Sequence, residues 1–269
     1  MIADIGGRRF EWGSRTYVMG IVNVTPDSFS GDGLGADHES AVAQGVRMVK
    51  EEADFLDVGG ESTRPGHVPI SAAEEISRTE RVVRDLARKS GVPVSIDTYK
   101  LEVAEAAVAA GATILNDIWG LTRSPALAGL AAKHGCALVL MHNQDGAHYA
   151  GDIMSEINRF LTAAAKVAIA AGVPRERILI DPGIGFGKTA EQNWEVMRRL
   201  DELKDVGLPI LVGTSRKSFM GKLLDLPVTE RLEGTAATVT AAVLRGADVV
   251  RVHDVKAMMR VVRTADHLR

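Results

Sequence analysis

Short, continuous apolar segments alternate along this chain with longer segments rich in Ala, Glu and Arg. The apolar segments lack the alternation of apolar and polar positions that marks a strand with one face in water. They are therefore typical of parallel strands covered on both faces. Eight of them are predicted as strands: Tyr17–Val24, Phe55–Val58, Val92–Ile96, Thr113–Leu115, Ala137–Met141, Ile178–Ile180, Pro209–Val212 and Asp248–Val252.

The segments between the predicted strands have the apolar spacing of helices. They are His38–Ala53, Ser71–Lys89, Leu101–Ala110, Pro125–Lys133, Ile153–Ala171, Ala190–Lys204 and Glu230–Leu244, and Val255–Leu268 follows the last strand. Eight β/α units in ~250 residues, with no linker between them, predict an α/β protein, a (β/α)8 TIM barrel of a single domain over residues 1–269. The alternative, a doubly wound dinucleotide fold, expects G-x-G-x-x-G after the first strand, where this chain has NVTPDSFSGDG.

Polar residues concentrate in the turns that lead from a strand into the next helix. The opposite turns, from helix to strand, are short and plain, as in AGA at 110–112 and HG at 134–135. Because the carboxyl ends of all eight barrel strands meet at one face, polar residues scattered along the sequence become neighbours there, where such barrels hold their active sites. Taken alone, a polar residue in such a turn is also a candidate helix N-cap. We expect this role for Thr98, Asp117 and Asp254.

The charge balance excludes binding through a broad basic surface. Lys and Arg total 32 against 35 Asp and Glu, which gives a net charge of −3. General nucleic-acid binders and polybasic membrane binders carry an excess of positive charge. We therefore expect neither a nucleic acid nor a membrane as partner, and any bound anion must be met by a few local cations.

Cysteine content and apolar run length bear on the compartment. The single cysteine, Cys136, lies in the strand-like run CALVLM and has no partner for an internal disulfide, so we expect a buried thiol in a reducing compartment. The sequence contains no run of about 18 apolar residues, so no transmembrane helix is predicted. The first residues, MIADIGGRRFEWG, lack the apolar stretch of a signal peptide. The expected location is the cytoplasm.

Several common catalytic motifs are missing from the sequence. GIGFGKT looks like a phosphate loop, but Pro182 stands where the Walker A motif requires glycine. Neither H-E-x-x-H nor C-x-x-C occurs, so no transition-metal site is indicated. The G-x-S-x-G turn of many serine hydrolases is also missing.

Two groups of strand-end residues fit a flat ligand with an anionic tail. Arg251 and His253 lie two positions apart at one strand end, so both side chains face the ring of strand ends. With Asn23 opposite, they suit a phosphate or a diphosphate, which Arg binds bidentately. A structural Arg paired with a carboxylate is the alternative interpretation.

The second group consists of acceptors from three different strands, Asp97, Asn116 and Asp181. Acceptors suit the N–H-rich edge of a ring such as an amino-pyrimidinone, and buried carboxylates without a partner are costly. Lys217 adds one cation between the two groups. The residues thus predict a site for a donor-rich flat ring that carries an anionic tail.

At these positions the chain resembles the dihydropteroate synthase family of pterin-binding enzymes. The matching motifs are GIVNVTPDSFS at 20–30, DVGGESTRPG at 57–66, SIDT at 95–98, NDI at 116–118, DPGIGFGK at 181–188, SRKS at 215–218 and RVH at 251–253. They span nearly the whole chain in the family's order, and the first two motifs and SRK are highly specific.

The resemblance implies a transferase of folate biosynthesis. It would join 4-aminobenzoate to 6-hydroxymethyl-7,8-dihydropterin diphosphate, giving 7,8-dihydropteroate and diphosphate, with Mg²⁺ as cofactor and a homodimer as the assembly. The roles it implies are pterin binding by Asp97, Asn116, Asp181, Phe186, Lys217 and Arg251; diphosphate binding by Asn23, Arg64, Arg251 and His253; Mg²⁺ binding by Asn23; and 4-aminobenzoate binding by Phe29, Thr63, Pro65 and Ser218.

The family reaction resembles a dissociative substitution in which diphosphate leaves before the arylamine attacks. Such a path needs a stabilised leaving group and a negative charge near the cation rather than a strong base. The resemblance therefore implies Asp97 and Lys217 as the catalytic residues, with Asp97 supplying the charge. The chain departs from the family after the fifth predicted strand, where it reads MHNQDGA instead of Met-His-Met-x-Gly-x-Pro.

Two rival functions stay open on the sequence alone. A pterin-dependent corrinoid methyltransferase shares the Asp and Asn ring contacts but has no use for SRKS or RVH as a diphosphate site. A non-catalytic pterin-binding protein keeps the ring contacts, and a turnover assay distinguishes it from an enzyme.

Overall fold

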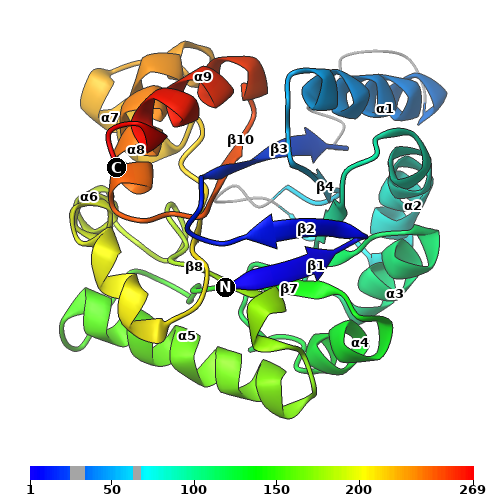
Figure 1. Cartoon of the computed structure of the whole chain (residues 1–269), viewed down its shortest axis with the longest axis horizontal. Coiled ribbons are helices and arrows are strands. Elements are labelled where there is room, and N and C mark those ends of the chain that lie inside the picture. Colours follow the sequence, from blue (N-terminus) through cyan, green and yellow to red (C-terminus); the bar gives the residue numbers. More distant parts are fainter. Residues whose placement is uncertain (25–33, 63–67) are drawn as a thin grey trace.

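The chain folds into a barrel of parallel strands surrounded by helices (Figure 1). The structure is a computed structural model that describes residues 1–24, 34–62 and 68–269, the side chains of residues 34–37 excepted. The barrel strands are β3 (Tyr17–Asn23), β4 (Phe55–Gly59), β5 (Val94–Asp97), β6 (Ile114–Asp117), β7 (Ala137–Met141), β8 (Ile178–Asp181), β9 (Leu211–Val212) and β10 (Val249–Val252). All eight predicted strands are present.

The order of the strands in the sheet is β8-β7-β6-β5-β4-β3-β10-β9, with every neighbouring pair parallel. The two ends of this sheet meet where Ile180 of β8 forms a parallel bridge with Ile210, just before β9. Ile180 N donates to Pro209 O at 2.9 Å across the same seam. The sheet is thus a nearly closed barrel, and the predicted (β/α)8 fold is confirmed.

Nine α-helices are described in the outer layer, α1 (Leu34–Lys50), α2 (Ala72–Lys89), α3 (Leu101–Ala110), α4 (Ala126–His134), α5 (Ile153–Ala170), α6 (Ala190–Arg198), α7 (Ser218–Leu224), α8 (Leu232–Leu244) and α9 (Val255–Asp266). Three short 3-10 helices join them, η2 (Arg175–Arg177), η3 (Leu200–Val206) and η4 (Val228–Glu230). Helix starts follow side-chain chemistry: Thr189 and Gln192 form a reciprocal capping box at α6. None of the described helices combines the length and the apolar character needed to span a bilayer.

Two helical details differ from the sequence expectation. The predicted helix Ala190–Lys204 is divided into α6 and the 3-10 helix η3. Helix α7 has only seven residues, and a helix of two turns is too short to show the periodicity by which we identified the others. It begins at Ser218.

A two-stranded hairpin, β1 (Ile2–Ile5) and β2 (Arg8–Glu11), precedes the barrel and was not predicted. Its turn is formed by Gly6 and Gly7, both at positive φ (58° and 75°), which is the backbone geometry of a tight two-residue hairpin turn. In Figure 1 the hairpin crosses the middle of the molecule, within the ring of helices.

The hairpin supplies the apolar filling of one end of the barrel. The Phe10 ring lies on Phe55, with centroids 4.4 Å apart, and edge-on to Tyr17 at 5.2 Å. Phe55 and Tyr17 are the first residues of β4 and β3, so this cluster occupies the amino-terminal end of the strands. A larger apolar cluster lies between the barrel and the helices. The polar residues are therefore left to the opposite, carboxyl-terminal end.

Truncation of the hairpin's central aromatic ring tests this account of the core. Phe10 is 3% exposed, and removal of a buried Phe side chain typically lowers the free energy of unfolding by ~3–5 kcal/mol. We expect Phe10→Ala to show a loss of this size in urea unfolding followed by circular dichroism. Ile2→Ala, on the same hairpin but 46% exposed, is the control and should differ little from the wild type. A loss below ~1 kcal/mol for Phe10→Ala would contradict the role of the hairpin as part of the core.

Candidate active site

The register of four neighbouring strands brings the first site residues to one level of the barrel. Asn23 of β3 pairs with Gly59 of β4, Gly59 pairs with Asp97 of β5, and Asp97 pairs with Asn116 of β6. Gly59 has no side chain, so Asn23 and Asp97 approach each other above it. From the point where a Cβ of Gly59 would stand, Asn23 Oδ1 is 3.7 Å away and Asp97 Oδ2 is 3.9 Å away.

Asp57 lies one layer deeper in the barrel and binds two of the predicted site residues. Its Oδ2 accepts hydrogen bonds from Arg251 Nε at 2.6 Å and from Asn116 Nδ2 at 3.0 Å, and the residue is fully buried. Because a carboxylate only accepts, the Asn116 amide must turn its NH₂ towards Asp57, so its carbonyl oxygen faces the other way as an acceptor. Asp57 therefore orients both residues.

No role was assigned to Asp57 on the sequence, although it stands within the motif DVGGESTRPG. A signal was present, because an acidic residue occupies the middle of the otherwise apolar run FLDV. Asp57 also lies two positions before Gly59 and hence on the same, inward face of β4.

Arg251 connects two acidic residues. Besides its bond to Asp57, its Nη2 donates to Asp97 Oδ2 at 2.8 Å. Two of the five N–H donors of the guanidinium serve these carboxylates. The alternative interpretation, a structural Arg paired with carboxylates, fits this geometry. The predicted role in anion binding fits it as well, because among the described residues the other N–H donors of the guanidinium are not used by these carboxylates.

The acidic groups of the site are held in an environment that disfavours their charged form. Burial raises the pKa of Asp97 from 3.8 to about 7, against the opposing effect of Arg251. Burial likewise raises the pKa of Asp181 to about 6, although Asp181 Oδ1 accepts a hydrogen bond from Gly183 N at 2.7 Å.

Within the described part of the chain, three buried oxygens of this region have no hydrogen-bond partner: Asp97 Oδ1, Asp57 Oδ1 and Ser95 Oγ. Unpaired buried acceptors are unfavourable, so a polar ligand or water that donates to them is stabilised. These oxygens in the barrel interior can accept hydrogen bonds from N–H or O–H groups, as the predicted binding of a pterin edge requires.

Lys217 supplies a cation whose hydration is incomplete. Burial, followed by the effect of Arg251, lowers its pKa to about 8. Its Nζ lies 4.1 Å from the centroid of the Phe186 ring, a cation–π contact. Two residues predicted to contact the pterin, one from the turn after β8 and one from the turn after β9, are therefore neighbours.

His253 is neutral rather than cationic in this structure. Burial and the neighbouring Arg251 lower its pKa to about 3. Ser215 Oγ accepts the His253 backbone N–H at 3.1 Å and lies 2.9 Å from Nδ1. The hydroxyl accepts the backbone N–H and can donate its own proton to Nδ1, an arrangement in which the imidazole proton is on Nε2. His253 thus offers a hydrogen-bond donor to an anion, not a charge.

The turns after β9 and β10 are joined by an ion pair. Arg216 donates to Asp254 through Nε at 2.9 Å and through Nη2 at 2.6 Å. This corrects the expectation for Asp254, whose side chain makes no N-cap hydrogen bond to α9. Its carboxylate instead holds the turn that carries Lys217 next to the turn that carries His253.

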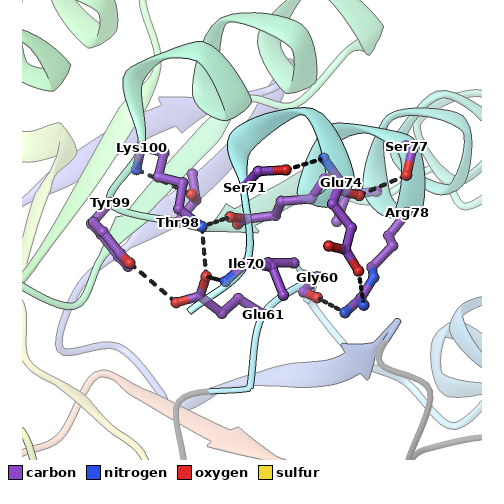
Figure 2. Close-up of polar contacts among 12 residues, drawn as sticks. Gly60, Glu61, Ile70, Ser71, Glu74, Ser77, Arg78, Thr98, Tyr99 and Lys100 are labelled. Atoms are coloured by element: carbon purple, nitrogen blue, oxygen red, sulfur yellow. Dashed lines mark hydrogen bonds and ion pairs between the residues drawn. The ribbon is translucent and has the colours of Figure 1, made fainter. Parts of the chain in front are cut away.

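The segment that follows β4 is anchored by Glu61 (Figure 2). Its Oε2 accepts from Ile70 N at 3.0 Å and from Lys100 Nζ at 2.5 Å, and Tyr99 donates to Oε1 at 3.1 Å. Lys100 also binds Glu75 at 2.6 Å. Tyr99 and Lys100 come directly after Asp97 and Thr98, so the two ends of segment 61–70 are fixed to the turn that leads away from the site.

The structure describes only one of the remaining predicted contact residues. Phe29, Thr63, Arg64 and Pro65 lie outside the described residues. Ser218 is the first residue of α7 and is exposed.

The site offers little to a resident metal ion. In the ranges covered by the structure, no three His, Cys, Asp or Glu side chains are grouped to hold one. Asn23 contributes a single carboxamide oxygen beside Gly59. Mg²⁺ commonly binds through one or two protein oxygens together with substrate phosphates and water. Asn23 therefore fits an ion that is shared with a bound diphosphate.

A family model described as "Pterin binding enzyme" matches residues 19–253, which include every described site residue. The chain belongs to the pterin-binding enzyme family. The resemblance inferred from the motifs is thereby confirmed.

Relatives and solved structures of the family cover nearly the whole chain. The chain is 48% identical over 263 residues to the dihydropteroate synthase of Clostridium beijerinckii, covering 97% of each protein. It superposes with a TM-score of 0.94 and 47% identity on a Clostridium difficile dihydropteroate synthase crystallised in the presence of pteroic acid, covering 96% of this chain and 98% of that one. For a Xanthomonas albilineans dihydropteroate synthase with 4-aminobenzoic acid, the TM-score is 0.93, the identity 40% and the coverage 99% and 97%.

The raised pKa of Asp181 predicts a pH-dependent gain of stability on its replacement. Because folding raises this pKa from 3.8 to about 6, the folded protein binds the proton more tightly than the unfolded one. The contribution of Asp181 to the free energy of unfolding therefore falls as the pH rises from about 4 through 6, and it stays low above that. Asp181→Asn keeps an acceptor for Gly183 N and should be more stable than the wild type at pH 8, by up to ~3 kcal/mol.

Urea unfolding of both proteins at pH 8 and pH 4 measures this difference. The gain should disappear at pH 4, where the wild-type carboxyl is protonated in the folded state. A variant that is less stable than the wild type at pH 8 would show that ionised Asp181 is stabilised rather than strained.

Proposed function

We infer that this protein is a dihydropteroate synthase, which condenses 6-hydroxymethyl-7,8-dihydropterin diphosphate with 4-aminobenzoate to give 7,8-dihydropteroate and diphosphate. The observation that carries this conclusion is the buried acceptor Asp97 Oδ1, unpaired within the described residues, beside the cation Arg251. Asp97 would accept from the ring N–H groups, and Arg251, which is hydrogen-bonded to Asp97, would donate to the anionic tail. Membership of the family supports the same conclusion, as does the 48% identity to a dihydropteroate synthase over 97% of this chain.

The pterin subsite is proposed to comprise Asp97, Asn116, Asp181, Phe186, Lys217 and Arg251. Its acceptors would bind the N–H groups of the amino-pyrimidinone edge, since Asn116 is oriented by Asp57 with its oxygen outward. Phe186 and Arg251 would form the flat surfaces against the ring, because both present planar groups. One domain over residues 1–269 would carry the whole site.

The diphosphate subsite is proposed to comprise Asn23, Arg251 and His253, with Arg64 from outside the described residues. Arg251 would offer its remaining N–H donors and His253 its Nε2–H. Asn23 would bind Mg²⁺ brought by the diphosphate, and the ion supplies neutralisation of the phosphate charge. This anion-binding set favours the synthase over the corrinoid methyltransferase, which has no diphosphate to bind.

The chemistry proposed for these residues is a dissociative substitution. The bond between the pterin methylene carbon and the ester oxygen breaks, and its electron pair leaves with the diphosphate. The 4-aminobenzoate nitrogen then forms the new C–N bond and releases a proton to water. Asp97 in its ionised form, which the pairing with Arg251 favours, would stabilise the cation between these steps, while Lys217 would lie between the ring and the leaving group. The arylamine would bind at Phe29, Thr63, Pro65 and Ser218.

Replacement of Asp97 tests the assignment. Asp97→Asn keeps the shape of the side chain but removes the charge that faces the cation, so we expect turnover to fall by ~10²–10³. Diphosphate release from the pterin substrate, measured with and without 4-aminobenzoate, gives the rate and also separates an enzyme from a non-catalytic pterin-binding protein. Asp248→Asn is the control, because Asp248 is buried and its pKa is raised, but it lies before β10 at the opposite end of the barrel. Near-normal turnover by folded Asp97→Asn would overturn the role of Asp97.

The protein is proposed to act in the cytoplasm, in keeping with a single buried thiol, Cys136, whose pKa burial raises to about 11. It is further proposed to form a homodimer through the face of α7 and α8. Leu223, Leu224, Val228, Leu232 and Leu244 are each at least 40% exposed, and all lie between residues 223 and 244. A mainly apolar cavity of about 280 Å³ lies beside them, lined among others by Trp194 and Met220. Exposed apolar side chains beside such a cavity support the proposal of a protein–protein interface.

The proposed dimer face is tested by placing a charge on it. Leu223 is 66% exposed, so Leu223→Glu should leave the fold of the isolated chain intact while converting a dimer of 28.7 kDa chains into monomers in sedimentation equilibrium. Val167→Glu, at a residue 47% exposed on α5, is the matched control and should stay dimeric. A monomeric wild type, or a Leu223→Glu dimer, would contradict the assembly or the face.

A further inference from the structure

The loop after β8 carries Phe186 into the site, and its backbone conformation depends on three glycines. Gly183, Gly185 and Gly187 all have positive φ, at 70°, 84° and 53°. The stem of Lys217 lies against Gly185, with Cδ 3.0 Å from the point where a Cβ would stand. The position of this loop, residues 183–187, therefore determines where Phe186 lies and limits the space beside the Lys217 side chain.

The underside of this loop rests on the segment after β7, where the sequence departs from the family pattern. A Cβ on Gly183 would stand 1.9 Å from His142 O, and one on Gly187 would stand 2.8 Å from Gln144 O. The Tyr149 hydroxyl donates to Gly187 O at 3.0 Å. The two segments are thus in direct backbone contact, and only glycine permits it.

Lys188 folds back under the loop and binds it at three points. Its Nζ donates to Gly183 O at 3.0 Å and to Phe186 O at 3.0 Å, and it lies 3.1 Å from His142 Nδ1. Burial lowers the pKa of Lys188 to about 7. In its charged form the side chain has three N–H donors, so these contacts use all of them. Lys188 therefore differs from Lys217, whose ammonium faces an aromatic ring of the site.

The third contact is well defined because His142 is neutral. Burial, followed by the effect of Lys188, lowers the pKa of His142 to about 3, so the ring is neutral and, with its proton on Nε2, its Nδ1 accepts a hydrogen bond from Lys188 Nζ. The His142 ring is held edge-on by Phe160, with centroids 4.9 Å apart. Lys188 thus joins the Phe186 carbonyl to a fixed imidazole on the neighbouring segment.

We propose that Lys188 is a positioning residue for the pterin ring, which fixes Phe186 through its carbonyl and ties the loop to His142. It contacts no substrate itself. The proposal rests on the pterin site inferred above and adds a residue that was given no role on the sequence.

Direct titration of 6-hydroxymethylpterin into the folded protein tests this role. Lys188→Met removes the N–H donors of this side chain. We expect the affinity for the pterin to fall roughly 5- to 10-fold, within the ~2- to 13-fold that one aromatic stacking contact contributes. The KM for 4-aminobenzoate at saturating pterin diphosphate should stay within about twofold of the wild type. Lys188→Gln keeps an amide donor and should give a smaller loss. Lys166→Met, at an exposed lysine on α5, is the control and should match the wild type.

A double-mutant cycle with Phe186 distinguishes positioning from a general loss of stability. If Lys188 acts through Phe186, Lys188→Met should weaken pterin binding by less than twofold in a Phe186→Ala background. Independent effects that multiply, or an equal loss for both substrates, would overturn the proposal, as would a Lys188→Gln chain that does not fold. A wild type that fails to bind 6-hydroxymethylpterin would instead refute the proposed function.

Discussion

One buried cluster of charges organises the site, namely the guanidinium of Arg251 between the carboxylates of Asp57 and Asp97. Removing one partner of a buried ion pair typically lowers the free energy of unfolding by ~3–5 kcal/mol, because the other charge is left uncompensated. Each of these side chains therefore depends on the others for its position. The same cluster orients Asn116 through Asp57. Arg251, Asp57 and Asp97 come from three strands, and the barrel is the structure that brings the three together.

Opposite ends of the barrel interior have opposite chemistry. At the amino-terminal end, Phe10 of the hairpin and Phe55 fill the interior with aromatic rings. At the carboxyl-terminal end the filling is charged, and burial raises the pKa of Asp97 to about 7 and that of Asp181 to about 6. The apolar end supplies the stability with which the protein tolerates carboxylates and unpaired acceptors at the other end, where a ligand would satisfy them.

The turns around the site are braced by groups that the substrate would not touch. Arg216 and Asp254 join the turns after β9 and β10, Glu61 joins segment 61–70 to Lys100, and Lys188 joins the loop after β8 to His142. Each brace is an ion pair or a charge-assisted hydrogen bond between different turns. Precise placement of binding groups requires such support, because loops are otherwise the most mobile parts of a barrel.

The sequence alone determined the barrel, and it predicted which strand-end residues would face one another at its carboxyl-terminal end, because continuous apolar strands and polar strand ends are local patterns that survive folding. Its motifs also identified the family. It did not reveal the hairpin as the filling of the barrel, although Gly6-Gly7 signalled a turn, since its partner Phe55 lies 45 residues from Phe10. Nor did it assign Asp57, the neutral state of His253 or the contacts of Lys188. These depend on burial and on distances between strands far apart in the chain, and only the tertiary structure decides them.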